Sequence, residues 1–161
     1  MEPMTSVYPT EEGPLYEQLK LELTGLIDGI PYQTANLANA AALIYQALTR
    51  INWAGFYLME GGQLVLGPFQ GKPACICIAV GRGVCGTAVK EDAIQRIADV
   101  HAFPGHIACD AASRSEIVLP IHQNGEVVAV LDIDSPFPDR FSEADQEGLS
   151  ALVEILEANW H

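Results

Sequence analysis

Two apolar runs joined by Asn124-Gly125 constrain the fold of this chain more than any other feature. The first run covers 116–123 and the second covers 126–134. An Asn-Gly pair between two such runs is the strongest short-range signal for a β-hairpin. We therefore expect the two runs to pair as antiparallel strands, with residues equidistant from the turn lying opposite each other.

The rest of the chain predicts helices near both ends and more strands between them. Apolar residues recur at helical spacing from Pro14 to Asp28 and from Gln33 to Leu48, and a capping-box pattern opens a last helix at Ser142. The segment 84–91 is compatible with a short helix. Further strands are predicted at 53–59, 63–66, 75–80 and 94–99. The expected fold class is α+β, with helices packed on a central antiparallel β-sheet of about six strands.

Length and composition predict one domain. The chain has 161 residues with 49% apolar content, which is ample for a single buried core. We expect 1–10 to form a flexible N-terminal tail and 11–161 to form the domain. No signal peptide is evident and no apolar run is long enough to span a bilayer, so a cytoplasmic protein is expected.

The charge balance excludes two classes of partner. The formal net charge is −13, with only eight Lys and Arg residues. A nucleic-acid backbone must be met by clustered cations, which this chain lacks. We therefore expect binding neither to nucleic acid nor to an anionic membrane surface.

The four cysteines are Cys75, Cys77, Cys85 and Cys109. A structural disulfide framework is not expected in a cytoplasmic chain, which leaves buried inert thiols, a metal site or redox chemistry. Cys75-Ile76-Cys77 is one residue tighter than a zinc knuckle, and no second close pair of ligands follows, so we expect no metal. In a strand, Cys75 and Cys77 would share a face, with Cα atoms about 7 Å apart, the outer limit for a disulfide.

Redox chemistry suits two of these cysteines. Cys109 lies in a polar loop after His101 and His106 and before Arg114, and a nearby positive charge favours the thiolate that a nucleophile needs. The alternative is an exposed loop thiol without a role. Cys85 lies at an expected helix start, where the helix dipole also favours a thiolate. Its alternative is a small packing residue beside glycines.

Three acidic residues are expected to meet on one face of the hairpin. Glu116 and Asp134 lie near mirror positions about the turn, and Asp132 shares a strand face with Asp134. Such acids repel each other unless they share a proton or a cation. The pattern favours a pocket for an ammonium group, with one carboxyl protonated. The alternative is a solvated face of the sheet.

Four motifs carry a resemblance to a known family. They are Gly-Pro-Phe-Gln-Gly-Lys-x-Ala-Cys at 67–75, Gly-x-Gly-Val-Cys-Gly-Thr-Ala at 81–88, His-x-x-Cys-Asp-x-x-Ser-x-Ser-Glu-Ile-Val at 106–118, and Leu-Asp-Ile-Asp-Ser at 131–135. Together they resemble the signature of the free methionine-(R)-sulfoxide reductases, an enzyme family with the GAF fold. The similarity covers nearly the whole chain. Most GAF domains are sensory modules that lack this triple-cysteine spacing, so a module that binds a small ligand without turnover is the alternative function.

The resemblance implies a role for three of the cysteines. Cys109 matches the nucleophile that attacks the sulfoxide sulfur, and Cys75 matches the resolving cysteine. Cys85 matches a third cysteine of the family, which is an alternative or secondary disulfide partner for the nucleophile. Cys77 matches no family position, so it either competes as the resolver or is inert. The resemblance further implies thioredoxin or a dithiol as reductant, no bound cofactor, and a homodimer.

The resemblance also implies the residues that bind free methionine-(R)-sulfoxide. Glu116 and Asp134 match the acids that hydrogen-bond and protonate the sulfoxide oxygen. Asp132 would help to hold the substrate's amino group. Trp53 and Tyr57 match an aromatic wall around the substrate, although ordinary core aromatics explain the same pattern.

Overall fold

The computed structural model describes residues 7–105 and 112–161 of the chain. Its helices are α1 (Glu12–Ile27), α2 (Gln33–Ala47), α3 (Gly83–Glu91) and α4 (Glu143–Ala158), with a short 3-10 helix, η1, at Val100–Ala102. Its strands are β1 (Trp53–Glu60), β2 (Gln63–Gly71), β3 (Cys77–Ala79), β4 (Gln95–Ile97), β5 (Ser115–Gln123) and β6 (Glu126–Ser135). No helix in the described ranges combines the length and the apolar character that crossing a membrane requires.

The strands form one sheet in the order β3-β2-β1-β6-β5-β4, and every neighbouring pair is antiparallel. The predicted hairpin is confirmed as β5 and β6. At its turn, Asn124 and Gly125 both have positive φ, at 54° and 79°. The register pairs Glu116 with Asp134, as the mirror positions predicted. The last helix begins with the predicted capping box of Ser142.

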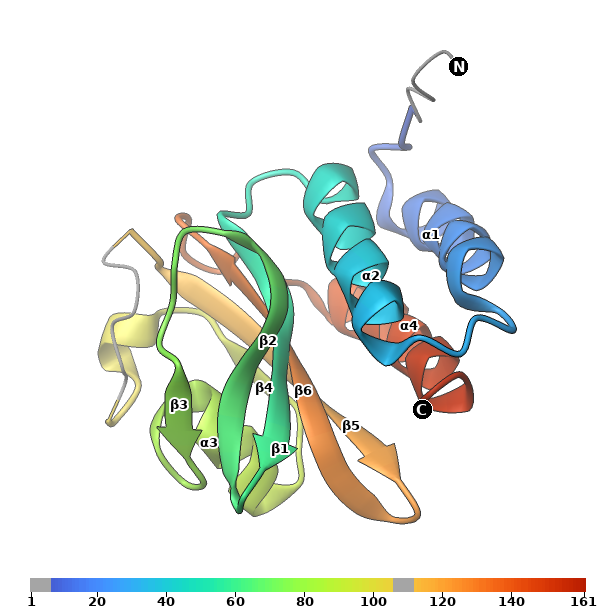
Figure 1. Ribbon diagram of the computed structural model, residues 1–161. Helices are drawn as coiled ribbons and strands as arrows, with labels where there is room; N and C mark the ends of the chain where they lie inside the picture. Colours follow the sequence, from blue (N-terminus) through green and yellow to red (C-terminus); the bar gives the residue numbers. More distant parts are fainter. Residues whose placement is uncertain (1–6, 106–111) are drawn as a thin grey trace.

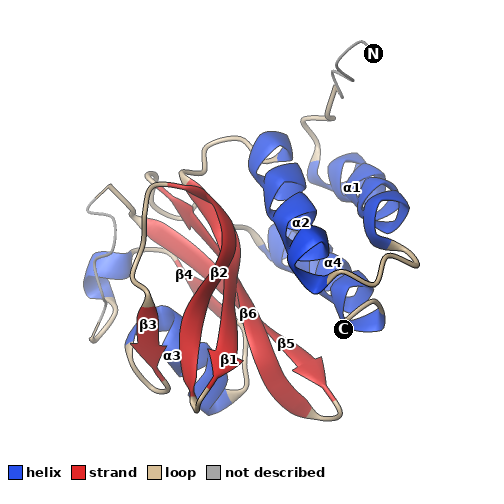
Figure 2. Cartoon of the chain, in the orientation of Figure 1, coloured by secondary structure: helices blue, strands red, loops and turns tan. Residues whose placement is uncertain are grey.

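The helices divide unequally between the two faces of the sheet. Figures 1 and 2 show α1, α2 and α4 on one side and α3 on the other. The helices α2 and α4 contact the strands directly, and α1 contacts both of these helices. The helix α3 contacts β3, β4, β5 and β6. The sheet therefore has a fully packed face under three helices and a second face that a single short helix covers only in part.

Strand alternation decides which side chains reach each face. Ile117 and Leu131 point toward the three helices and belong to the main hydrophobic core. Val118 and Val130 point the other way and belong to a second buried cluster with α3. Because the period is two, Glu116 shares the face of Val118, and Asp132 shares that of Val130. The acids therefore lie on the α3 side of the sheet.

Two strand boundaries differ from the sequence prediction. The strand β2 continues to Gly71 rather than ending at 66, because its second half pairs with the first residues of β1. The strand β3 covers only Cys77–Ala79, so Cys75 precedes it. Pro73 lacks a backbone N–H, which disfavours ladder pairing at the start of this segment.

Candidate active site

A cavity of about 50 Å³ lies between the second face of the sheet and α3. Its walls come from segments that are far apart in the sequence. They are the start of β1, the segment 72–74, β3, the start of α3, and the paired ends of β5 and β6 with Ser113. Six of the eight predicted site residues line this cavity: Trp53, Tyr57, Cys85, Glu116, Asp132 and Asp134.

The three acids lie together on this wall. Glu116 is opposite Asp134 on the ladder, and Asp132 lies two residues earlier on β6. Glu116 and Asp132 are only 7% and 5% exposed. Burial raises the pKa of Glu116 well above its ordinary value, and the charge of Asp132 raises it further. Burial also raises the pKa of Asp132, although hydrogen bonds with Glu116 and Cys85 oppose that rise.

These shifts have one physical consequence for the acids. Ionising both buried acids beside Asp134 would be costly, so burial and the charge of Asp132 favour a proton on Glu116. The expectation of one protonated carboxyl therefore agrees with the geometry. The alternative, a solvated face, disagrees with the burial of Glu116 and Asp132.

The predicted ionisation of Cys85 is wrong. Cys85 is the third residue of α3, as the helix-start prediction requires, but its side chain is buried. Burial raises the pKa of the thiol well above its ordinary value, and the charge of Asp132 raises it further. A helix terminus contributes only about 0.3–1 kcal/mol in most settings, so burial outweighs it. Cys85 is a protonated thiol beside the acids.

Gly86 fixes the position of α3 and therefore of Cys85. A Cβ atom at Gly86 would lie 2.4 Å from the backbone oxygen of Ala79. The backbone N–H of Gly81 donates to the oxygen of Gly86 at 2.8 Å. Because glycine has no Cβ, the first turn of α3 can pack directly against the 79–81 turn.

The two aromatic residues both line the cavity and support the segment that carries Cys75. The Nε1 atom of Trp53 donates to the backbone oxygen of Lys72 at 3.1 Å, and the hydroxyl of Tyr57 donates to that of Cys75 at 2.9 Å. The Trp53 ring stacks between Tyr57 and Phe69, with centroid distances of 6.0 and 5.1 Å. Burial raises the pKa of Tyr57, so its phenol remains a donor. Trp53 and Tyr57 are thus core aromatics and cavity walls at once.

The cysteines differ in environment. Cys75 is disulfide-bonded, whereas Cys77 is exposed and Cys85 is buried, and both of these are free thiols. Cys75 packs against the second cluster, so the prediction that it shares a face with Cys77 is wrong. The reason is that Cys75 precedes the strand in which the two-residue period applies. Cys109 lies outside the described residues.

Sequence reasoning missed three polar residues at the cavity. Lys72, Arg82 and Ser113 also line it. Lys72 lies in the first of the four motifs, Arg82 is the variable residue between the two glycines that open the second, and Ser113 lies in the third. Their position within these motifs was the available signal. The cavity thus combines three carboxyl groups with two cations.

Cys85, Glu116 and Asp132 also form a group that could hold a metal ion. One ligand atom from each residue lies within 4.8 Å of the others. The spacing of cysteines and histidines in the sequence does not indicate this group, because its members come from α3, β5 and β6. Unlike Cys75-Ile76-Cys77, it brings three potential ligand atoms close enough to bind one ion.

Comparisons with known proteins identify the family. The GAF domain profile matches residues 34–160. The free methionine-R-sulfoxide reductase of Escherichia coli is 57% identical over 142 residues, which cover 88% of this chain and 86% of that protein. This chain belongs to the free methionine-(R)-sulfoxide reductase family. The resemblance that the four motifs carry is therefore confirmed.

Solved structures of the family have the same fold. The free methionine-R-sulfoxide reductase of Neisseria meningitidis, in complex with its substrate, superposes with a TM-score of 0.93 at 38% identity, covering 99% of this chain and 95% of that one. The Staphylococcus aureus protein fRMsr in its reduced form gives a TM-score of 0.89 at 51% identity, with coverage of 97% and 99%. The predicted α+β class is confirmed as the GAF fold, a six-stranded antiparallel sheet with four α-helices.

Proposed function

We propose that this chain reduces free L-methionine (R)-sulfoxide to L-methionine. One observation carries the proposal: the buried Glu116 and Asp132 and the half-buried Asp134 share a cavity with Lys72 and Arg82. A free amino acid has an ammonium group and a carboxylate, and this cavity offers groups of opposite charge to both. The names of the Escherichia coli and Neisseria meningitidis relatives support the same substrate.

The first half of the reaction uses Cys109 and Glu116. The Cys109 thiolate attacks the sulfoxide sulfur, and Glu116 supplies a proton to the sulfoxide oxygen. The oxygen then moves to the Cys109 sulfur: a Cys109 sulfur–oxygen bond forms, while the substrate's sulfur–oxygen bond and the transient sulfur–sulfur bond break. Methionine leaves, and Cys109 is left as a sulfenic acid. The raised pKa of Glu116 supports this role, because burial and the charge of Asp132 favour the protonated carboxyl that a proton donor requires. Asp134, its ladder partner, assists at the same oxygen.

The second half of the reaction restores the enzyme. The Cys75 thiol condenses with the sulfenic acid of Cys109, which forms a disulfide and releases water. Thioredoxin, or another dithiol, then reduces this disulfide by exchange and is itself oxidised. The disulfide-bonded state of Cys75 supports its assignment as the resolving cysteine, since Cys77 and Cys85 remain free. Cys85 serves at most as a secondary partner.

Recognition of the free amino acid follows from the charges. Asp132 and Asp134 accept hydrogen bonds from the ammonium group, while Lys72 or Arg82 binds the carboxylate. A peptide nitrogen supplies no charge, and leaving a buried carboxylate unpaired costs about 1–3 kcal/mol. Selectivity for the free amino acid over a sulfoxide within a blocked peptide is therefore expected to be about tenfold or more.

The proposal extends to the setting of the enzyme. Residues 11–161 act as one catalytic domain without a bound cofactor, with thioredoxin as the reductant. As the family resemblance implies, the protein works as a homodimer, and we place it in the cytoplasm. The alternative function is a sensory GAF module that binds a small ligand without turnover.

An epimer assay separates the two functions. Purified protein is incubated with free methionine (R)- or (S)-sulfoxide and dithiothreitol, and released methionine is measured by chromatography. The proposal expects turnover of the R epimer and little of the S epimer. If the R epimer is not turned over, the proposed enzymatic function is wrong and the ligand-binding module is the better interpretation.

A further inference from the structure

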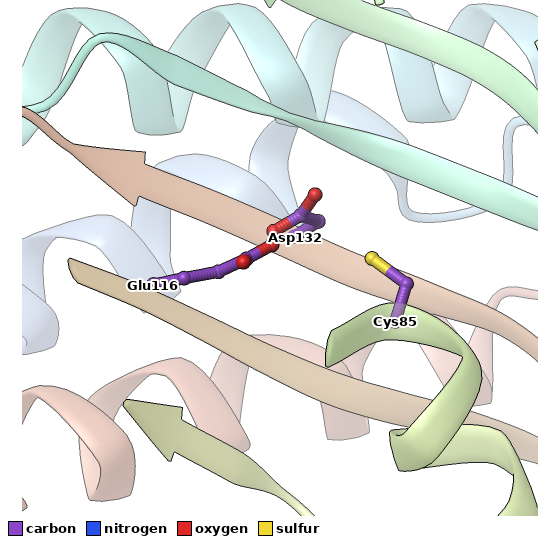
Figure 3. Close-up of side chains that lie close together, drawn as sticks. All are labelled: Cys85, Glu116 and Asp132. Carbon is purple, nitrogen blue, oxygen red and sulfur yellow. The ribbon is translucent and has the colours of Figure 1, made fainter. Parts of the chain in front are cut away.

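A thiol and two carboxyl groups meet at one buried point of the cavity. The Sγ atom of Cys85 and an oxygen from each of Glu116 and Asp132 lie within 4.8 Å of one another. All three side chains are at most 7% exposed. In Figure 3 the sulfur of Cys85 points from α3 toward the carboxyl groups on the two strands. These three elements converge although their residues are far apart in the sequence.

The Oδ1 atom of Asp132 has no hydrogen-bond donor. This oxygen is buried and has no partner, and Asp132 itself is 95% buried and lines the cavity. An unpaired buried polar atom is rare in folded proteins, and an unoccupied ligand position is one physical explanation for it. A carboxylate oxygen of this kind has a lone pair that no protein donor uses. This observation is independent of the clustering of the three residues.

The donor set selects the class of ligand. One sulfur and two carboxylate oxygens suit Zn²⁺ and its thiophilic analogue Cd²⁺, whereas Mg²⁺ and Ca²⁺ require six or more oxygen ligands. A cavity of about 50 Å³ has room for an ion with one or two waters. Asp134, which faces the same cavity, adds negative charge that favours a dication. Cys85 is a free thiol while Cys75 is disulfide-bonded, so the donors are present in the oxidised protein as well.

We propose that a thiophilic divalent cation of the Zn²⁺ class binds in this cavity through Cys85, Glu116 and Asp132. Binding displaces two protons to solvent, one from the Cys85 thiol and one from the Glu116–Asp132 pair, and the thiolate and carboxylates then offset the charge of the ion. The ion occupies the wall that the proposed reaction assigns to the substrate's ammonium and sulfoxide groups. The ion and the substrate therefore compete for this wall, and the ligands do not include Cys75 or Cys109.

Cadmium binding to single-thiol proteins tests the thiol ligand. In the Cys85-only protein, which carries Cys75→Ser, Cys77→Ser and Cys109→Ser, Cd²⁺ should produce the ultraviolet thiolate-to-metal charge-transfer band at one equivalent. The matched control keeps only the exposed Cys77 and replaces the other three cysteines by serine. Equal or weaker cadmium binding by the Cys85-only protein would overturn the proposal. Because neither protein can turn over substrate, the outcome is independent of the proposed reaction.

Zinc affinity tests the two carboxylate ligands. Competition with a chromogenic chelator should show that Glu116→Gln or Asp132→Asn, each made in the Cys85-only protein, weakens Zn²⁺ binding on the order of 100-fold. Glu126→Gln, at the exposed end of the same hairpin, should leave the affinity unchanged. Unchanged affinity in Asp132→Asn would contradict the assignment. If the Cys85-only protein does not fold, the Cys77→Ser protein with its disulfide intact serves instead, after thiol titration has verified a single free thiol.

Discussion

Glu116 on β5 and Asp134 on β6 are direct partners on the antiparallel ladder, and Asp134 is in turn paired with Trp53 on β1. One row across three adjacent strands therefore presents two acids and an indole to the cavity. Like charges directly opposite each other destabilise a sheet. The arrangement is stable only if one acid is protonated or a cation is bound, which is the property that the proposed reaction uses.

Glu116→Gln tests the proposed proton donor. The amide keeps the shape of the side chain but is not an acid, so kcat for free methionine (R)-sulfoxide should fall by about 10²–10⁴-fold. The free energy of unfolding should not decrease, because one of two opposing carboxyl groups is removed. Steady-state kinetics and urea unfolding measure both effects. Glu126→Gln, at the exposed turn end of the same hairpin, is the control and should leave kcat and the free energy of unfolding unchanged. A kcat for Glu116→Gln equal to that of the parent protein would exclude Glu116 as the proton donor.

Serine substitutions should separate the four cysteines by kind of defect. Cys109→Ser should abolish even a single turnover, because the nucleophile forms the first methionine. Cys75→Ser should still release up to one methionine per subunit but lose thioredoxin-supported cycling. Cys85→Ser should be milder, and Cys77→Ser should be close to wild type. Rapid-quench measurement of methionine, with mass spectrometry of disulfides, gives the readout. A single-turnover burst in Cys109→Ser would contradict its role as nucleophile. Full cycling in Cys75→Ser together with loss of cycling in Cys77→Ser would contradict the assignment of Cys75 as the resolving cysteine.

Tyr57→Phe tests the support of the Cys75 segment. The substitution removes the hydrogen bond to the backbone oxygen of Cys75 and should reduce the free energy of unfolding by about 1 kcal/mol. Because only the resolving segment is loosened, thioredoxin-supported cycling should slow while the single-turnover burst persists. Tyr32→Phe is the matched control, since Tyr32 is 69% exposed. A loss of the burst in Tyr57→Phe would instead place Tyr57 in the first chemical step.

The sequence was sufficient for the features that local rules determine. The Asn124-Gly125 turn fixed the β5–β6 register, and the two-residue period then placed Glu116, Asp132 and Asp134 on one face. These predictions needed only turn chemistry and strand alternation. The cap at Ser142 was equally local.

The features that sequence could not predict depend on packing between distant segments. The ionisation of Cys85 was mispredicted because its burial results from the contact of α3 with β5 and β6, which no local pattern reports. The contribution of Lys72 and Arg82 also required the third dimension, since their segments meet only across the cavity. The separate environments of Cys75 and Cys77 depended on where β3 begins.

A histidine on the opposite end of the hairpin links three elements. The Nε2 atom of His122 on β5 pairs with Asp92, which caps α3, and its Nδ1 atom lies 3.3 Å from an oxygen of Glu157 on α4. The backbone N–H of His122 also donates to Glu157 at 2.6 Å. The hydrogen bond with Asp92 is the largest cause of a raised pKa for His122, and the charges of Asp92 and Glu157 add to it.

The free energy of unfolding should therefore depend on pH through His122. A group whose pKa is raised by folding stabilises the native state fully below its unfolded pKa, about 6.5 for histidine, and loses that contribution as pH rises through the folded pKa. His122→Gln should accordingly destabilise the protein more at about pH 5.5 than at about pH 8.5, with a modest effect because the pair is partly exposed. Urea unfolding at both pH values measures the difference, with His161→Gln at the exposed last residue as the control. Equal destabilisation at the two pH values would show that the ion pair with Asp92 does not stabilise the fold.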